Sequence, residues 1–230
     1  MRVPPPNLPI GSGRKRTGMR VLTVGTDCAV GKKYSALAIT RELQRRGVKA
    51  TFRATGQTGI MIAGEGLPID AVVCDFTAGA AEVLSPDNDA DHWDVIEGQG
   101  SLFHPGYAAV TLGLLHGSQP DAIVVCHEVG RRSHAGCDYP LPDLVECIDM
   151  HVAMGRRTNP GLRCVGVCLN TRLVPAGERR AYLEEVALRT KVTCVDPLVE
   201  GPAAIVDELL RGTPLAPADA ARAAPQPRTA

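Results

Sequence analysis

The sequence predicts a doubly wound α/β domain with a mostly parallel sheet. Short apolar, often β-branched runs alternate along the chain with segments of helical periodicity. The apolar runs are continuous, which is typical of strands that helices bury on both faces. The first run leads directly into a loop containing glycine and lysine and then into a helix, as in phosphate-binding loops. In such sheets ligands bind at the carboxyl ends of the strands, so the loops that follow the strands are where the site is expected.

The expected strands are the continuous apolar runs. They cover residues 19–25, 48–54, 69–76, 93–100, 120–128, 162–171 and 191–197. The expected helices fill most of the intervals between them. They cover residues 32–47, 107–117, 140–156, 176–190 and 203–212. In the first helix Ile39 and Leu43 recur on one side, and Gly47 supplies the stop.

One domain is expected over residues 19–212, preceded by a linker or arm over residues 1–18. The arm is rich in proline, glycine, arginine and lysine. Residues 213–230 are biased toward alanine and proline without periodicity, which predicts a disordered tail. The start has no apolar segment like that of a secretory signal, and no apolar run reaches the roughly 18–20 residues of a membrane span. A cytoplasmic protein without a membrane partner is therefore expected.

The net charge argues against nucleic acid as a partner, and the cysteine spacing argues against a zinc site. The 25 lysines and arginines balance the 25 aspartates and glutamates, so the formal net charge is zero. This balance gives no electrostatic reason to expect nucleic acid, and a small-molecule substrate is expected instead. The eight cysteines form no C-x-x-C pair and no Cys/His quartet with zinc spacing. Those in or beside apolar runs are expected to be small buried hydrophobes. They are Cys74, Cys126, Cys164, Cys168 and Cys194.

The loop after the first strand is similar to the phosphate-loop consensus G-x-x-x-x-G-K-[ST]. Gly31 and Lys32 supply its G-K, but the first glycine is Gly25, one residue early. Backbone N–H groups can still converge on an anion at the start of the helix. A glycine-containing turn that opens an amphipathic helix is the plainer alternative. The predicted phosphate site consists of Gly25, Thr26, Asp27, Cys28, Ala29, Val30, Gly31, Lys32 and Lys33.

Lys33 is the larger departure, because the consensus has there the hydroxyl that ligates Mg²⁺. Ser35 lies two residues further, about 200° around the helix, and cannot simply take its place. Magnesium could still be held by Thr26, by water or by acidic residues of other loops. A loop that grips a phosphate chain without cleaving it is therefore a serious alternative to a phosphoryl-transfer loop.

Two acidic residues end predicted strands. Asp75 ends the run 69–76, and Glu97 follows the buried pair Val95 and Ile96. Facing a phosphate loop, both could bind Mg²⁺ or orient an amine substrate. A helix N-cap is an equally good interpretation of Asp75, whereas a carboxylate at the end of a buried run, such as Glu97, needs a partner.

Polar residues at other strand ends each have a functional and a structural interpretation. His127 suits a general base by its pKa range, although a hydrogen-bonded structural histidine is the commoner case. Asn170 could read an adenine edge or form a turn. The loop after the second strand suits either substrate binding or an ordinary turn. Its candidate substrate-binding residues are Thr55, Gln57 and Thr58.

Several of these segments together resemble a known family. VGTDCAVGK, RATGQTGIMIAGEGLPIDAVVCDFTAGAAE, EGQGSLFHPGY and GSQPDAIVVCHE are similar to the C-terminal P-loop domain of the D-glutamate N-acetyltransferase family. The resemblance covers about residues 3–210, and the opening VPPPNLPIGSG is similar to that family's interdomain linker. Members usually carry an N-terminal Rossmann-like domain. The resemblance therefore implies that a separate partner chain would supply that domain here, and a homo-oligomer is also expected.

A more distant resemblance is to dethiobiotin synthetase, whose loop G-T-D-x-x-V-G-K matches Gly25 to Lys32. The E-G-x-G turn of that enzyme matches the segment that starts at Glu97, and its aspartate after the third strand matches Asp75. The resemblance implies a dethiobiotin synthetase-like P-loop NTPase fold in which these acidic groups hold Mg²⁺ near ATP. Lys33 departs from both families, since one has threonine after the lysine and the other usually Met-Thr.

Three functions stay open. The first resemblance implies transfer of an acetyl group from acetyl-CoA to the amine of an acidic D-amino acid such as D-glutamate. Glu97 or His127 would take the ammonium proton, and Gln99 or glycine amides would stabilise the oxyanion. Arg131 would hold a substrate carboxylate. The alternatives are an ATP/Mg²⁺-dependent ligase or kinase-like enzyme of the dethiobiotin synthetase type, and a truncated nucleotide-binding regulatory module.

Overall fold

The computed structural model describes residues 3–211, so the tail expected over residues 213–230 lies outside it. The strands are β1 (Met19–Gly25), β2 (Ala50–Arg53), β3 (Trp93–Ile96), β4 (Ala122–Glu128), β5 (Arg163–Asn170) and β6 (Cys194–Val195). The helices are α1 (Lys32–Arg45), α2 (Gln57–Ala63), α3 (Thr77–Leu84), α4 (Ala108–Ser118), α5 (Leu144–Gly155), α6 (Arg179–Thr190) and α7 (Ala203–Leu210). Two 3-10 turns lie between α2 and α3, namely η1 (Ile69–Ala71) and η2 (Cys74–Phe76).

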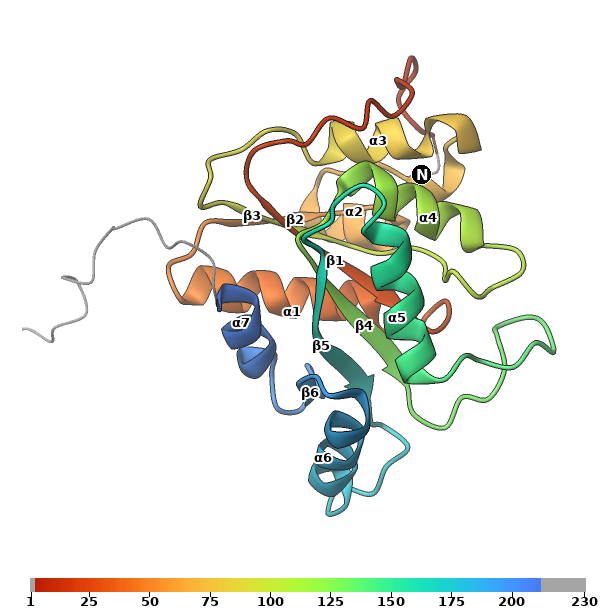
Figure 1. The fold of residues 1–230 in the computed structure, drawn as a ribbon, viewed down its shortest axis with the longest axis vertical. Helices are drawn as coiled ribbons and strands as arrows, with labels where there is room; N and C mark the ends of the chain where they lie inside the picture. The colour runs from red at the N-terminus through yellow and green to blue at the C-terminus, as the bar shows by residue number, and fades with distance from the viewer. Residues whose placement is uncertain (1–2, 212–230) are drawn as a thin grey trace, which may run out of the picture.

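The strands form a six-stranded sheet in the order β2-β3-β1-β4-β5-β6 (Figure 1). Each neighbouring pair is parallel, so all the strands end at the same edge. The sheet and its helices confirm the doubly wound α/β fold. The order also places β1 and the loop that follows it at the centre of that edge, where ligands of such sheets bind.

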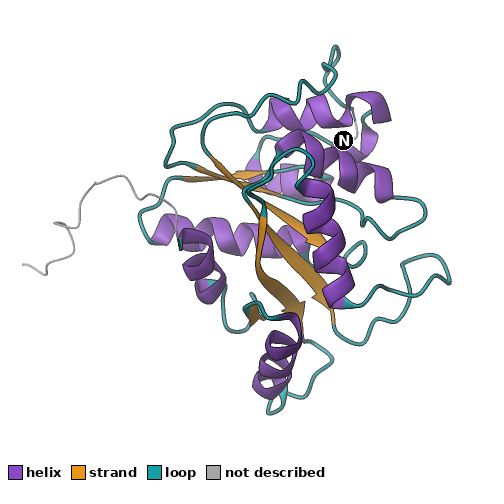
Figure 2. Ribbon diagram, in the orientation of Figure 1, coloured by secondary structure: helices purple, strands orange, loops and turns teal. Residues whose placement is uncertain are grey.

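Helices cover both faces of the sheet, as Figure 2 shows. On one face, α1 and α7 pack on the strands through buried residues such as Ile39 and Ile205. On the other face α3, α4, α5 and α6 do so, with Leu114 and Leu183 among the core residues. This two-sided burial explains why the strands are continuous apolar runs. No helix among residues 3–211 is both long and apolar enough to cross a membrane.

The strand predicted over residues 69–76 is wrong, because the segment forms η1 and η2 and leads into α3. Pro68 precedes it, and the N–H of Ala71 donates to the carbonyl of Pro68 in a local turn. Donors used in such turns are not available for a sheet ladder. The sheet consequently has six strands where seven were expected, and Asp75 lies in a 3-10 turn and not at a strand tip.

The same error affects one of the cysteines. Cys126 and Cys168 are buried in strands, as predicted, and Cys164 and Cys194 are half-buried. Cys74 is exposed, because the run to which it belongs does not enter the sheet.

Two helices that the periodicity did not predict lie beside this segment. Helix α2 has only seven residues, between Gly56 and Gly64, and α3 has eight. Both are short, and their glycine- and alanine-rich sequences give no clear helical periodicity. The polar residues after β2 therefore begin a helix, and are not part of an extended loop.

The arm before β1 lies along α3 and α4 without forming a helix or strand within residues 3–18. Arg16 is buried, and its guanidinium donates to the carbonyls of Ser85 and Gly117 at 2.7 Å each. Glu82 of α3 accepts the N–H groups of Ser12 and Gly13. These contacts hold the arm against the domain.

Candidate functional site

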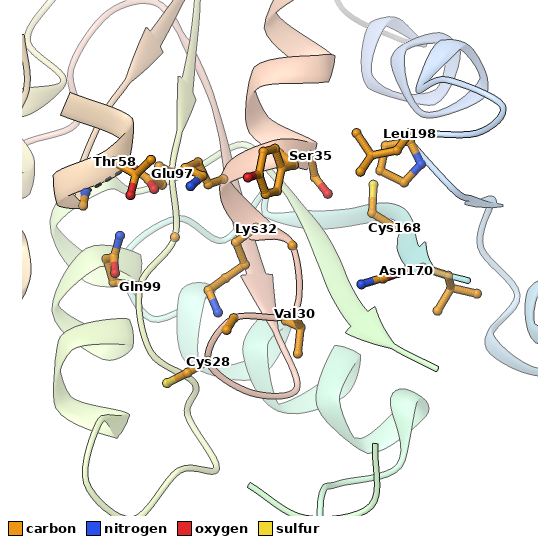
Figure 3. A pocket seen from close by; sticks show the side chains of 18 of the residues that line it. Cys28, Val30, Lys32, Ser35, Thr58, Glu97, Gln99, Cys168, Asn170 and Leu198 are labelled. Carbon is orange, nitrogen blue, oxygen red and sulfur yellow. Dashed lines mark hydrogen bonds between the residues drawn. The ribbon is translucent and has the colours of Figure 1, made fainter. Parts of the chain in front are cut away.

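A cavity of about 640 Å³ lies at the carboxyl ends of the strands. This volume falls within the range of about 300–1,000 Å³ that is usual for small-molecule sites. Its walls come from the loop after β1, the start of α1, and the segments that follow β2, β3, β5 and β6 (Figure 3). The sequence-predicted residues that line it are Cys28, Ala29, Val30, Gly31, Lys32, Lys33, Gln57, Thr58, Glu97, Gln99 and Asn170.

The loop between β1 and α1 has the conformation of an anion-binding nest. Ala29 and Gly31 have φ values of 56° and 108°, whereas Val30 between them does not have a positive φ. Alternation of right- and left-handed residues turns successive N–H groups toward one side. No side chain caps α1, and its first turn contains no acidic residue. The N–H groups at the start of α1 therefore face a site suited to an anion.

The early glycine of this loop has a packing reason. A Cβ on Gly25 would lie 2.8 Å from the carbonyl oxygen of Cys126 and 2.8 Å from Cγ2 of Val30. Gly25 therefore lets the end of β1 approach β4 and the returning loop. Thr26, the next residue, is fully buried, and its hydroxyl lies 2.9 Å from Nδ1 of His127.

Lys32 reaches back across the loop. Its ammonium donates to the carbonyls of Asp27 and Gly100, at 2.7 and 2.8 Å. Burial lowers the pKa of Lys32. Figure 3 shows this side chain near the middle of the cavity, with Glu97 on one side and Asn170 on the other.

Asp27 joins the loop to the segment after β4. One oxygen accepts Arg131 at 2.7 Å and the N–H of Ala135 at 2.8 Å, and the other lies 3.1 Å from Nδ1 of His134. Burial raises the pKa of Asp27, but the hydrogen bonds from Arg131 and His134 outweigh it and hold the pKa below its usual value. Arg131, predicted to bind a substrate carboxylate, instead pairs with Asp27 and Glu128 and does not line the cavity.

Arg131→Ala is expected to lower the free energy of unfolding by about 2–3 kcal/mol, because it leaves the buried carboxylate of Asp27 short of its charged partner. Arg132→Ala is the matched control, since that neighbouring side chain is exposed, and it should change stability by less than about 0.5 kcal/mol. Urea unfolding followed by circular dichroism measures both. Equal midpoints for the two variants would contradict the role given to Arg131.

Glu97 is a buried carboxylate on the cavity wall. Its Oε2 accepts the N–H groups of Thr55 and Gly56 at 2.9 and 3.0 Å. Burial raises its pKa, against the opposing effect of these N–H groups and of Lys33 and Lys32. A Cβ on Gly59 would lie 2.1 Å from Oε2, so α2 sits directly over the carboxylate. Glu97 can therefore exchange a proton with a bound ligand from a fixed position.

Gln99 lies beside Glu97 and also lines the cavity. Its Nε2 donates to the hydroxyl of Thr55 at 3.0 Å, and that hydroxyl donates to the carbonyl of Glu97 at 2.7 Å. Thr55 is fully buried behind the wall. It orients Gln99 and does not itself face the cavity, unlike Thr58 and Gln57, which do.

His127 does not line this cavity. It is bonded to Thr26, and burial together with the charge of Arg131 lowers its pKa. Asp75 is exposed on η2 and does not line the cavity either. The structure therefore does not bring Asp75 and Glu97 together as a pair of metal ligands.

The far end of the cavity depends on Asp196, which follows β6. Its carboxylate accepts the N–H and hydroxyl of Thr171, at 3.0 and 2.6 Å, and the N–H of Leu198 at 3.0 Å. These bonds hold Asn170 and Leu198 against the same space (Figure 3). Asn170 Oδ1 also accepts the N–H of Arg172 at 3.2 Å, so this residue both forms a turn and lines the cavity.

Sequence reasoning missed several lining residues. The dipeptide Asp196-Pro197 at a strand end was a usable signal, because Asp-Pro marks a turn. Nothing local distinguishes the others, which reach the cavity only through the tertiary fold. They include Ser35, Asp70, Cys168, Arg172 and Arg179.

A second cavity of about 550 Å³ adjoins the first. Cys28, Asp70, Gln99 and Gly100 line both cavities. The second is otherwise mostly apolar, with walls from η1, η2 and the start of α4. A ligand that follows the loop past Cys28 can therefore extend from one cavity into the other.

Asp27, Cys28 and His104 have ligand atoms that lie within 4.8 Å of one another. However, Nε2 of His104 lies 3.0 Å from the carbonyl of Ala135, and its Nδ1 accepts the N–H of Gly106. With both ring nitrogens engaged and Asp27 already paired, this cluster is suited to holding the loop and not to holding a metal.

Comparison with known protein families also identifies a P-loop domain in this chain. A family model described as a domain of unknown function, DUF1611_C P-loop domain, matches residues 9–206. This chain belongs to the DUF1611 family. A solved DUF1611 protein from Anabaena variabilis has a TM-score of 0.85 and 34% identity, over 91% of this chain and 63% of that one.

Two curated relatives of this DUF1611 chain are named D-glutamate N-acetyltransferase. The one from Tritonibacter scottomollicae is 52% identical over 91% of this chain and 63% of its own length. The one from a Pseudoalteromonas species is 47% identical over 86% and 60%. The DUF1611 chain thus spans about three fifths of the length of the relatives it matches.

The fold extends beyond DUF1611. A cobyrinic acid a,c-diamide synthase from Mycobacterium smegmatis, solved with bound ADP and magnesium, has a TM-score of 0.53 at 16% identity, over 85% of this chain and 95% of that one. At that identity the likeness concerns the fold alone, and it agrees with the predicted P-loop NTPase architecture.

Proposed function

We propose that this chain is the CoA-binding part of an N-acetyltransferase that acetylates the amine of an acidic D-amino acid such as D-glutamate. The observation that carries the proposal is the buried carboxylate of Glu97 in the same cavity as an uncapped phosphate loop. Such a cavity combines an anchor for a phosphorylated ligand with a proton acceptor. The names of the two curated relatives supply the reaction type and the acceptor.

The residues present fit acetyl-CoA. The N–H groups at the start of α1, with Lys32 and Lys33, would hold the diphosphate. Asn170 and Leu198 would face the adenine at the far end of the cavity. The mostly apolar second cavity, reached past Cys28, suits the uncharged thioester arm.

In the reaction, Glu97 takes one proton from the ammonium group of the acceptor, and its raised pKa makes it a stronger base than an exposed glutamate. Acetyl-CoA supplies the activated acyl group as a thioester. The nitrogen–carbon bond forms as the carbon–sulfur bond breaks, and the second nitrogen proton leaves with the sulfur as a thiol. Gln99 and the N–H groups of the glycines beside it would stabilise the developing oxyanion. The proton on Glu97 then passes to solvent.

A second candidate is an ATP/Mg²⁺-dependent enzyme, favoured by the carboxylate of Glu97 near a P-loop. Against it, Lys33 replaces the hydroxyl ligand, and the hydroxyl of Thr26 is buried against His127. A nucleotide-binding regulatory module would have the binding site without the reaction. The predicted partner chain and homo-oligomer stay predictions, and light scattering of the purified chain would test the second of them.

Isothermal titration with CoA and with ATP, each with and without Mg²⁺, tests the proposal. CoA is expected to bind without Mg²⁺ and to compete with acetyl-CoA. Binding of ATP that requires Mg²⁺, with no binding of CoA, would instead support the second candidate. Acetylation of D-glutamate by the purified chain separates the enzyme from a module that only binds.

Lys33→Thr restores the consensus hydroxyl and removes one positive charge. Since the half-buried Lys33 lines the cavity at the start of α1, affinity for CoA is expected to fall by a few-fold, about 1 kcal/mol for the loss of one surface charge. Titration with CoA and with ATP·Mg²⁺ measures the change. An unchanged affinity for CoA together with new tight binding of ATP·Mg²⁺ would show that the loop is built for phosphoryl transfer.

A further inference from the structure

Two groups of positive charge line the main cavity, and a diphosphate accounts for only one of them. Lys32 and Lys33 lie at the start of α1, whereas Arg172 and Arg179 come from the segment after β5. Strand β5 is two strands away from β1 in the sheet, which corresponds to about 10 Å. That separation is of the same order as the size of a nucleoside.

The two arginines differ in how their charge is compensated. Arg172 pairs with Glu128 through Nε and Nη2, at 2.8 and 2.6 Å. Arg179 donates through Nε to the carbonyl of Val174 at 3.1 Å and makes no ion pair with a carboxylate among residues 3–211. The Val174 contact uses only Nε, so Arg179 lines the cavity with a charge that no carboxylate among residues 3–211 compensates.

The surroundings favour a nucleotide at this end. Arg172 follows Asn170 by two residues, and Pro197, Leu198 and Val199 form an apolar wall of the same cavity. An apolar wall with one amide and nearby guanidinium groups suits a base and a phosphorylated ribose. The proposed reacting end, with Glu97, Gln99 and Thr58, lies on the other side of Lys32 (Figure 3). A carboxylate of the acceptor held by Arg179 would be remote from Glu97.

We propose that Arg179, supported by Arg172, binds a phosphate on the ribose of the ligand and selects CoA over nucleotides that lack it. This inference rests on the proposed use of CoA, whose ribose carries a 3′-phosphate separate from the diphosphate. Arg179 is thus a specificity residue, and it takes no part in the acyl transfer.

CoA and dephospho-CoA are each titrated against the wild type and against Arg179→Ala. The four affinities form a double-mutant cycle, in which one change removes the arginine and the other removes the 3′-phosphate. The wild type is expected to bind CoA about 10–100-fold more tightly than dephospho-CoA, as for a charge-assisted hydrogen bond. Arg179→Ala should bind both ligands with the affinity that the wild type has for dephospho-CoA. Arg179→Gln, which keeps a polar side chain, should behave in the same way.

Arg180→Ala is the matched control, since Arg180 is exposed and pairs with Glu184 on the outer side of α6, and it should keep the full preference. Equal affinity of the wild type for the two ligands, or an equal loss for both in Arg179→Ala, overturns the inference while leaving CoA use intact. Loss of D-glutamate binding with the preference for CoA unchanged would assign Arg179 to the acceptor and also overturn it. A wild type that binds neither CoA nor dephospho-CoA would refute the proposed function itself.

Discussion

Glu97→Gln is expected to slow acetyl transfer to D-glutamate by about 10²–10⁴-fold, the usual contribution of a positioned general base. Glutamine has nearly the same shape, and its carbonyl can accept the N–H groups of Thr55 and Gly56 in place of the carboxylate. Binding of CoA should therefore change little. Steady-state rates and CoA titration measured on the same preparation separate the two effects.

The pH profile gives an independent readout. Burial raises the pKa of Glu97, and a base must be deprotonated to act. The rate should therefore fall as pH drops through a pKa that lies above the ordinary glutamate value, and Glu97→Gln should lose that acidic limb. Glu65→Gln is the control, since Glu65 is exposed after α2 and does not line the cavity, and it should keep the wild-type profile. A Glu97→Gln enzyme with full activity would exclude this carboxylate as the base.

Glu97→Gln is expected to lower activity without lowering the stability of the fold. A carboxyl group whose folded-state pKa is raised stabilises the fold below the unfolded pKa, and this contribution is lost as pH rises through the folded pKa. Above the folded-state pKa of Glu97 the wild type has lost this contribution, whereas Glu97→Gln cannot ionise. Above that pKa the variant is therefore expected to be at least as stable as the wild type, and in thermal unfolding the difference should shrink as pH falls through it.

Lys32→Met is expected to weaken CoA binding by about 10–150-fold, the equivalent of one charge-assisted hydrogen bond. Methionine keeps most of the length of the buried side chain but removes the ammonium that donates to Asp27 and Gly100. Arg41→Ala, an exposed cation on the same helix, should leave the titration unchanged. The Lys32 role fails if the two variants bind CoA equally well.

What the sequence could predict depended on how local each feature is. The phosphate loop is one contiguous segment between β1 and α1, so its spacing was readable, and Glu97 stood out as an acidic residue directly after a buried run. Asp27, in contrast, is bonded to His134, which lies 107 positions away in the sequence. No local pattern predicts such a pairing. The 69–76 segment had strand-like composition, but local turns and an adjoining short helix prevailed there.

Two residues of the predicted site, His127 and Arg131, contact the phosphate loop and do not line the cavity. Both have side chains that could act on a ligand, and both lie at or just after the end of β4. Their partners, Thr26 and Asp27, belong to the phosphate loop after β1. A histidine or arginine that supports the loop from behind has the same sequence signature as one that faces the ligand. Only the direction of the side chain separates them, and that is set by the packing of β4 against β1.

The contacts of Lys32 and Asp27 have a kinetic consequence. The loop is already preorganised before any ligand arrives, because its carbonyls, its carboxylate and its lysine are bonded to one another and to the segments after β3 and β4. Little conformational entropy then remains to be lost on association. Association should accordingly be fast in the wild type and in variants that keep these bonds, such as Lys33→Thr, and their differences in affinity should appear mainly as changes in residence time.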